Sequence, residues 1–111
     1  KGGDRLDGGT GNDKLIGSSG NDILIGGAGK DKIRAGKGRD QFVLTTGKQF
    51  DLILDFQDRQ DKLALADNLK RNKLDIFQQG NDVVIAFKTD DLAILRGVDS
   101  DRIGKADFVT L

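Results

Sequence analysis

The sequence predicts an all-β protein in which short parallel strands coil into a solenoid. The first 40 residues have a nine-residue period, in which glycine stands two positions before each aspartate: Gly2 and Asp4, Gly11 and Asp13, Gly20 and Asp22, Gly29 and Asp31, Gly38 and Asp40. A large apolar residue follows each of these aspartates two positions later, at Leu6, Leu15, Leu24, Ile33 and Phe42. All 18 acidic residues are Asp, which favours turns over helices. A fixed period of this kind is typical of repeat proteins.

Each repeat combines a glycine-rich turn of six residues with a strand of three. Full repeats span residues 8–16, 17–25, 26–34 and 35–43, and a truncated copy spans 1–7. Glycine permits positive φ angles, which bring consecutive carbonyl groups to one side of a turn. Two repeats complete one coil of eighteen residues, so each turn stacks on the second turn after it. This arrangement places Asp4, Asp22 and Asp40 along one edge and Asp13 and Asp31 along the other.

Stacked aspartates of this kind indicate a metal ion. Neighbouring strands lie roughly 4.8 Å apart, and carboxylates at that spacing repel unless a cation lies between them. Calcium suits the gap, because it takes about 6 to 8 oxygen ligands from carboxylates and carbonyls in tolerant geometry. Five apolar side chains also return too little free energy, at about 1.5 to 3 kcal/mol each, to order some forty residues at roughly 1 to 2 kcal/mol each. The alternative is a metal-free solenoid or a disordered linker rich in Gly, Asn and Asp.

The repeat G-G-x-G-x-D-x-U-x, where U is a large apolar residue, resembles that of the RTX (repeat-in-toxin) family of calcium-binding β-rolls. These rolls form C-terminal modules of serralysin-type proteases, lipases and polysaccharide epimerases that leave the cell by type I secretion. The resemblance implies a right-handed parallel β-roll with two nonapeptides per coil, which binds about three to five calcium ions. It also implies that the aspartates bind through their carboxylates and the other turn residues through backbone carbonyls.

The resemblance implies three sites, each between two turns that lie eighteen residues apart. The ligands of the first are Gly9, Gly11 and Asp13 with Gly26, Ala28 and Asp31. The ligands of the second are Ser18, Gly20 and Asp22 with Ala35, Lys37 and Asp40. The ligands of the third are Gly2 and Asp4 with Gly17, Ser19 and Asp22, and this site lacks one carbonyl because the chain begins at Lys1.

The glycine register stops after Val43, and a closing segment follows. Residues 50–56 alternate between apolar and polar, and residues 61–65 follow a polar turn, so both are expected to be strands. This segment resembles the D-x-I-x-D-F stretch that closes many such rolls. The resemblance implies a last site made by Asp55 and Asp61 with Gly36, Gly38 and Asp40. The alternative is that Asp55 and Asp61 are exposed turn residues.

The remaining residues are expected to cap the solenoid, because its stacking must end in a protected edge. Residues 66–73 are interpreted as a helical turn capped by Asp67, and residues 74–77, 82–88 and 92–95 as an antiparallel series of strands. We expect a single domain over residues 1–111, made of the roll (1–43), a last coil (44–65) and the cap (66–111).

The last five residues, Asp107 to Leu111, allow two interpretations. They resemble the uncleaved C-terminal signal of proteins exported by type I machinery, and a final edge strand explains the same residues. The sequence contains neither an N-terminal signal peptide nor a membrane span. The chain is therefore expected to be the C-terminal part of a larger extracellular protein, secreted from a Gram-negative cell, whose catalytic or toxic activity lies elsewhere.

Charge and composition exclude several functions. The net charge of zero conceals a balance of +2 over residues 1–43 and −2 over the remainder. The basic roll is either an ordinary solvated surface or a site for an acidic polysaccharide. Nucleic acid is not expected, since the 6 Phe residues lie in apolar strand patterns. With no His and no Cys, the chain lacks a zinc site and a catalytic triad, so it is not expected to be an enzyme.

Two functions are consistent with these observations. In the first, the chain is a non-catalytic calcium-binding module that folds outside the cell and supports folding and type I secretion of a larger protein. In the second, the calcium-stabilised roll binds an acidic polysaccharide or a partner domain of the same protein.

Overall fold

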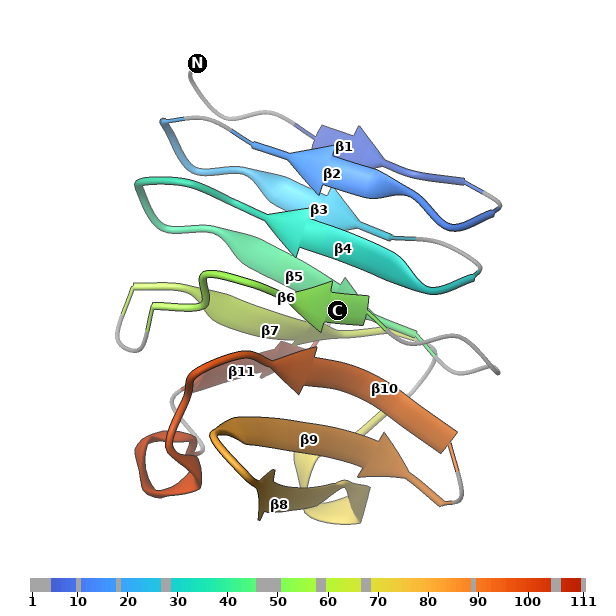
Figure 1. Cartoon of the computed structure of the whole chain (residues 1–111), viewed down its shortest axis with the longest axis vertical. Coiled ribbons are helices and arrows are strands. Elements are labelled where there is room, and N and C mark those ends of the chain that lie inside the picture. Colours follow the sequence, from blue (N-terminus) through green and yellow to red (C-terminus); the bar gives the residue numbers. More distant parts are fainter. Residues whose placement is uncertain are drawn as a thin grey trace.

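The computed structural model describes residues 5–9, 11–17, 19–26, 29–45, 51–57, 60–66, 69–88, 90–104 and 107–110. The chain forms two β-sheets that face each other (Figure 1). The first sheet has the strand order β1-β3-β5-β7-β11, with β1 Arg5–Asp7, β3 Ile23–Ile25, β5 Gln41–Leu44, β7 Lys62–Leu65 and β11 Phe108–Thr110. The second has the order β2-β4-β6-β10-β9-β8, with β2 Lys14–Ile16, β4 Asp31–Arg34, β6 Asp51–Ile53, β10 Asp90–Leu95, β9 Asp82–Phe87 and β8 Asp75–Gln79.

From β1 to β7, successive strands alternate between the two sheets, so every second strand is a parallel neighbour. Leu6 of β1 pairs with Leu24 of β3, and Leu15 of β2 pairs with Ile33 of β4. Both pairs are eighteen residues apart, as expected for two nonapeptides per coil. The predicted parallel β-roll is therefore confirmed.

After Val43 each coil contains more residues, but its strands remain paired in register with those of the coil before. Asp51 of β6 pairs with Asp31 of β4, a separation of twenty residues, and Lys62 of β7 pairs with Gln41 of β5, a separation of twenty-one. The extra residues lie in the turns, so the strands still stack. The closing segment thus adds one more coil to the solenoid.

The apolar residues of the repeat point between the sheets and form the core. Leu24, Ile33 and Phe42 are fully buried there, and the Phe42 ring lies 6.0 Å from the ring of Phe56 in the closing segment. Leu6 and Leu15, near the open end of the roll, are only partly buried against this core. Burial therefore increases from the first coil toward the cap.

The cap continues the second sheet. β10 pairs in parallel with β6 and antiparallel with β9, and β9 pairs antiparallel with β8. The predicted antiparallel series is confirmed, and its parallel junction with the roll was not predicted. Its apolar residues, including Val83, Ile85 and Leu95, join the core of the roll.

Two details of the cap differ from the expectation or refine it. The helical turn is a 3₁₀ helix over Arg71–Lys73. Lys70 is its N-cap residue and makes no side-chain hydrogen bond to it. Asp67, the expected cap, lies outside the described residues. A second 3₁₀ helix spans Ser100–Arg102. β11 lies parallel to β7 at the edge of the first sheet. No helix within the described ranges is long and apolar enough to span a membrane.

Candidate metal centre

Glycine shapes the turns because neighbouring turns lie in direct contact. Gly29 and Gly38 have φ angles of +96° and +108°, in the region that side chains rarely adopt. A Cβ atom at Gly29 would also collide with the carbonyl of Gly11, and one at Gly38 with the carbonyl of Gly20. At Gly29 and Gly38, the absence of a side chain thus allows one turn to rest on the turn eighteen residues before it.

Two asparagine side chains each bind the turn stacked eighteen residues later. The backbone N–H of Lys30 donates to Asn12 Oδ1 at 3.0 Å, and that of Arg39 donates to Asn21 Oδ1 at 2.9 Å. Each bond joins residues eighteen positions apart, so these amides fix the spacing between coils.

The repeat aspartates form a similar ladder with one oxygen each. Asp31 Oδ1 accepts a hydrogen bond from the N–H of Asp13 at 2.8 Å, and Asp40 Oδ1 accepts one from the N–H of Asp22 at 2.8 Å. Asp22, Asp31 and Asp40 are at most 1% exposed. Carboxylates are thus buried along both edges of the roll.

Four buried carboxylate oxygens, three of them in repeat aspartates, accept no hydrogen bond from a donor group within the described part of the chain. The buried atoms concerned are Asp13 Oδ2, Asp31 Oδ2, Asp40 Oδ2 and Asp51 Oδ1. Burying an unpaired carboxylate oxygen is costly, so such groups pair with cations or metals. These oxygens are therefore candidate ligands.

Backbone carbonyls approach the same carboxylates. A Cβ atom added to Gly8 would lie 2.5 Å from the carbonyl oxygen of Gly26 and 2.7 Å from Asp13 Oδ2, so these two oxygens border one small space. An equivalent space at Gly17 is bordered by the carbonyl oxygen of Ala35 at 2.5 Å and Asp22 Oδ2 at 2.9 Å. Carbonyl and carboxylate oxygens are the ligands that calcium prefers, so both sets fit the ion.

These sites differ from a cluster of acidic side chains. No group of three such side chains that could hold a metal occurs among the residues described. An ion here would instead take a carboxylate from each of two stacked turns and complete its shell with carbonyls. The large share of backbone ligands explains why glycine, serine, alanine or lysine can occupy the other turn positions.

A family profile described as the RTX calcium-binding nonapeptide repeat matches residues 1–33 in four copies. Residues 1–33 are therefore similar to RTX calcium-binding repeats. A comparison with curated proteins found no match.

Solved structures with RTX rolls resemble the whole chain. The AlgE6R3 subunit of the Azotobacter vinelandii mannuronan C5-epimerase has 26% identity and a TM-score of 0.64, over 96% of this chain and 77% of that subunit. The extracellular lipase LipA from Serratia marcescens has 25% identity and a TM-score of 0.62, over 98% of this chain but only 20% of the lipase. The AlgE6R2 subunit of the same epimerase has 22% identity and a TM-score of 0.59, over 92% of this chain and 91% of that subunit, and shows the fold alone.

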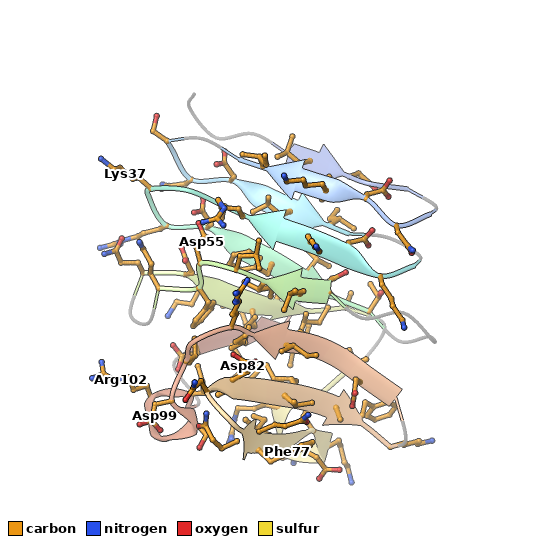
Figure 2. All side chains as sticks on the ribbon, in the orientation of Figure 1. Lys37, Asp55, Phe77, Asp82, Asp99 and Arg102 are labelled. Atoms are coloured by element: carbon orange, nitrogen blue, oxygen red, sulfur yellow. The ribbon has the colours of Figure 1, made fainter. Side chains whose placement is uncertain are left out.

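The predicted ligands of the first two RTX sites lie in stacked turns, as far as they are described. The structure describes most of these ligands: Gly9, Gly11, Asp13, Gly26 and Asp31 of the first site, and Gly20, Asp22, Ala35, Lys37 and Asp40 of the second. The Lys37 side chain points away from the roll (Figure 2), which leaves only its carbonyl to serve as a ligand. Gly2, Asp4, Ser18 and Ala28 lie outside the described residues, so of the third site only Gly17, Ser19 and Asp22 are placed.

The predicted last site contains carboxylates that already have partners. Asp55 accepts hydrogen bonds from the N–H groups of Ala35 at 2.9 Å and Gly36 at 2.8 Å. Asp61 accepts one from Asp40 at 2.9 Å and one from Gln57 at 2.9 Å. Asp55 and Asp61 therefore do approach the turn that contains Gly36, Gly38 and Asp40, but both oxygens of each bind backbone N–H groups.

Asp51 is a buried aspartate that the sequence analysis did not assign to a site. It pairs in register with Asp31 and is 6% exposed, so it extends the column of Asp13 and Asp31 by one coil. Asp51-Leu52-Ile53 keeps the D-x-U pattern of the repeats, which was the available signal. The glycine two positions earlier is missing, since residue 49 is Gln, and the coil is two residues longer.

The buried carboxylates have raised pKa values. Burial, then the negative charge of Asp31, and then a hydrogen bond between the two carboxyl groups raise the pKa of Asp51 to about 8. Burial also raises the pKa of Asp40 to about 6, although a hydrogen bond from the backbone of Asp22 opposes the shift. The pKa of Asp61 is raised by burial as well. Without a cation, these groups therefore retain protons at pH values where exposed aspartates are ionised.

Proposed function

We propose that this chain is a non-catalytic calcium-binding RTX module that folds when calcium binds outside the cell. The observation that carries the proposal is the set of buried carboxylate oxygens without partners, Asp13 Oδ2, Asp31 Oδ2 and Asp40 Oδ2, which lie along both edges of the roll. A metal-free protein would spend folding free energy to bury these charges. Calcium binding offsets that cost only in the folded state, so ion binding and folding are linked.

The ligand sets proposed for the ions follow the stacked turns. The first site takes Gly9, Gly11, Asp13, Gly26, Ala28 and Asp31, and the second takes Ser18, Gly20, Asp22, Ala35, Lys37 and Asp40. The third takes Gly2, Asp4, Gly17, Ser19 and Asp22, and the last takes Gly36, Gly38, Asp40, Asp55 and Asp61. The approach of the Gly26 carbonyl to Asp13, and of the Ala35 carbonyl to Asp22, supports the first two sets.

Far-UV circular dichroism of the chain, with calcium and with a chelator, tests this function. We expect a β-sheet spectrum in millimolar calcium and loss of most of that signal in chelator. Magnesium at the same concentration should not replace calcium, because it demands octahedral geometry and retains its water ligands. A chain that keeps its full β-sheet signal in chelator would show that calcium does not drive folding.

We further propose that calcium-dependent folding serves type I secretion of a larger protein. Calcium is scarce inside cells and millimolar outside, so a module of this kind stays unfolded until export. One structural neighbour is described as an extracellular lipase. Residues 107–111 are the proposed export signal. Fused behind a reporter in a cell that carries a type I exporter, the intact chain should direct secretion, and a chain whose last five residues are scrambled should not.

A second candidate function uses the outer face of the second sheet. Lys14 of β2 and Lys32 of β4 are exposed and pair directly across the two strands. Arg34, also exposed, pairs with Ile16 at the end of the same strands. These residues, with Leu15 and Leu54, border a hollow of about 220 Å³. Like charges opposite each other destabilise a sheet, so an anionic polymer bound across both strands would relieve the repulsion. The epimerase that contains AlgE6R3 is named for mannuronan, a polyuronate.

Titration of the calcium-loaded chain with polymannuronate tests the second function. A triple variant with Lys14, Lys32 and Arg34 changed to Gln should lose saturable binding. The matched control changes Lys70, Arg71 and Lys73, three exposed cations of the cap, to Gln and should retain it. Equal binding by both variants would exclude the face of β2 and β4 as the site.

A further inference from the structure

The column of aspartates along the second sheet continues beyond the nonapeptide repeats. Lys14 pairs with Lys32, which places Asp13 beside Asp31, and Asp31 pairs directly with Asp51. The next residue of the same row is Ala93 of β10, which pairs with Asp51. Asp51 therefore ends the column, just before the sheet passes into the cap.

Asp31 and Asp51 present two buried oxygens to one point. Asp31 is 1% exposed and Asp51 is 6% exposed. Asp31 Oδ2 and Asp51 Oδ1 accept no hydrogen bond from any other group that the structure describes, and in the absence of a cation the two carboxyl groups are joined by a hydrogen bond through one proton. A Cβ atom added to Gly26 would lie 2.6 Å from Asp31 Oδ2 and closer still to Asp51 Oδ1. The absence of a side chain at position 26 thus leaves a space bordered by two carboxylates from consecutive coils.

The end of the other column provides an internal comparison. Asp61 extends that column beyond Asp40, also through a lengthened coil, but hydrogen bonds from Asp40 and Gln57 satisfy both of its oxygens. Lengthening the coil therefore does not by itself leave a carboxylate unsatisfied. Asp51 differs from Asp61 because one of its oxygens faces the carboxyl group of Asp31 and no backbone N–H donor.

We propose that Asp31 and Asp51 hold an additional calcium ion, at a site outside the nonapeptide register. The inference rests on the proposed calcium-dependent function and adds a ligand, Asp51, to it. Hard carboxylate oxygens and a space at a glycine backbone are suited to calcium. An ion at this position also joins the last repeat turn to the coil that carries the cap.

Native mass spectrometry of the whole chain in calcium, combined with thermal unfolding, tests the site. D51N should bind one ion fewer than the wild type. In chelator, D51N should retain at least as much β-sheet signal as the wild type, because asparagine cannot ionise beside Asp31. The control D107N changes a carboxylate of similar burial, 4% exposed, outside the two columns, and should leave the ion count unchanged.

Two outcomes separate this inference from the proposed function. A wild-type chain that binds no calcium would overturn the proposed function and the inference with it. If the wild type folds with calcium but D51N binds the same number of ions, only the additional site is wrong. If D51N fails to fold, a crystal structure of the calcium-loaded wild type decides. Calcium density between Asp31 and Asp51 supports the site, and a direct hydrogen bond between the two carboxyl groups overturns it.

Discussion

At Gly17 the roll leaves no room for a side chain. A Cβ atom there would lie 2.5 Å from the carbonyl oxygen of Ala35 and 2.9 Å from Asp22 Oδ2. Both distances are shorter than any van der Waals contact. Glycine at the first turn position therefore does more than allow turn geometry, since it keeps open the space beside two proposed ligands.

We expect Gly17→Ala to weaken calcium binding and destabilise the calcium-loaded chain by about 1 to 3 kcal/mol, the usual cost of overpacking. Calcium titration followed by circular dichroism should show a higher midpoint for the variant. Gly104→Ala is the control, because its Cβ would meet no atom within 4 Å, and its midpoint should match the wild type. An unchanged midpoint for Gly17→Ala would mean that the space beside Asp22 is not needed for binding.

The asparagine ladder permits a second prediction at a single residue. Asn21→Ala removes the acceptor for the N–H of Arg39 and should cost roughly 0.5 to 1.5 kcal/mol, the net value of one hydrogen bond. Urea unfolding in saturating calcium measures this cost. Asn72→Ala, at an exposed position of the 3₁₀ helix in the cap, should cost less. A larger loss for Asn72→Ala would contradict a role for the ladder in stacking.

Among the elements, β10 joins the roll to its cap. It pairs in parallel with β6 and antiparallel with β9, and Leu95 at its end is fully buried in the shared core. Elements that share a sheet and a core are expected to unfold together. We therefore propose that residues 1–111 form a single domain through this junction.

Leu95→Ala should destabilise the calcium-loaded chain by about 2 to 5 kcal/mol and lower the urea midpoint in one transition for the whole chain. Phe77→Ala, in a strand of the same sheet but at a side chain that is 44% exposed, should have a smaller effect. Two separate transitions in Leu95→Ala would show that the roll and the cap are independent units.

The same elements show why the repeats were easier to predict than the segment after them. Between residues 5 and 43, glycine and aspartate occupy the same turn positions in every repeat. Their spacing alone therefore predicted the strands and the two columns of aspartates. Beyond Val43 the turns lengthen and glycine no longer stands two positions before the aspartate, although Asp51 and Ile53 keep the register. The parallel pairing of β6 with β10 joins residues about forty positions apart, and local sequence does not specify such a contact. The proposed role of Asp51 depends on its pairing with Asp31 across a lengthened turn, and this pairing appeared only in the structure.

For the whole molecule, protons and calcium compete for the buried carboxylates. In the calcium-free fold the pKa of Asp51 is raised from 3.8 to about 8, and that of Asp40 from 3.8 to about 6. The folded state binds more protons than the unfolded state between these limits. The stability from these two groups is thus fully present below about pH 4 and is lost as the pH rises through about 6 and then about 8.

We therefore expect the calcium-free chain to gain β-sheet structure between about pH 8 and about pH 5, and calcium affinity to rise over the same range as the pH increases. Circular dichroism in chelator and calorimetric titrations in buffers of different ionisation enthalpy measure both effects, the latter through the protons released on binding. A calcium-free chain that loses structure on acidification through this range would contradict the assigned shifts.

The central claim is that the two aspartate columns hold calcium between stacked turns. The most direct measurement is an anomalous-difference map from crystals of the calcium-loaded chain. We predict peaks between consecutive coils on both edges of the roll, each beside one of the unpaired oxygens of Asp13, Asp31 and Asp40. Strong peaks only at exposed aspartates such as Asp7 and Asp75, with none in the columns, would contradict the claim.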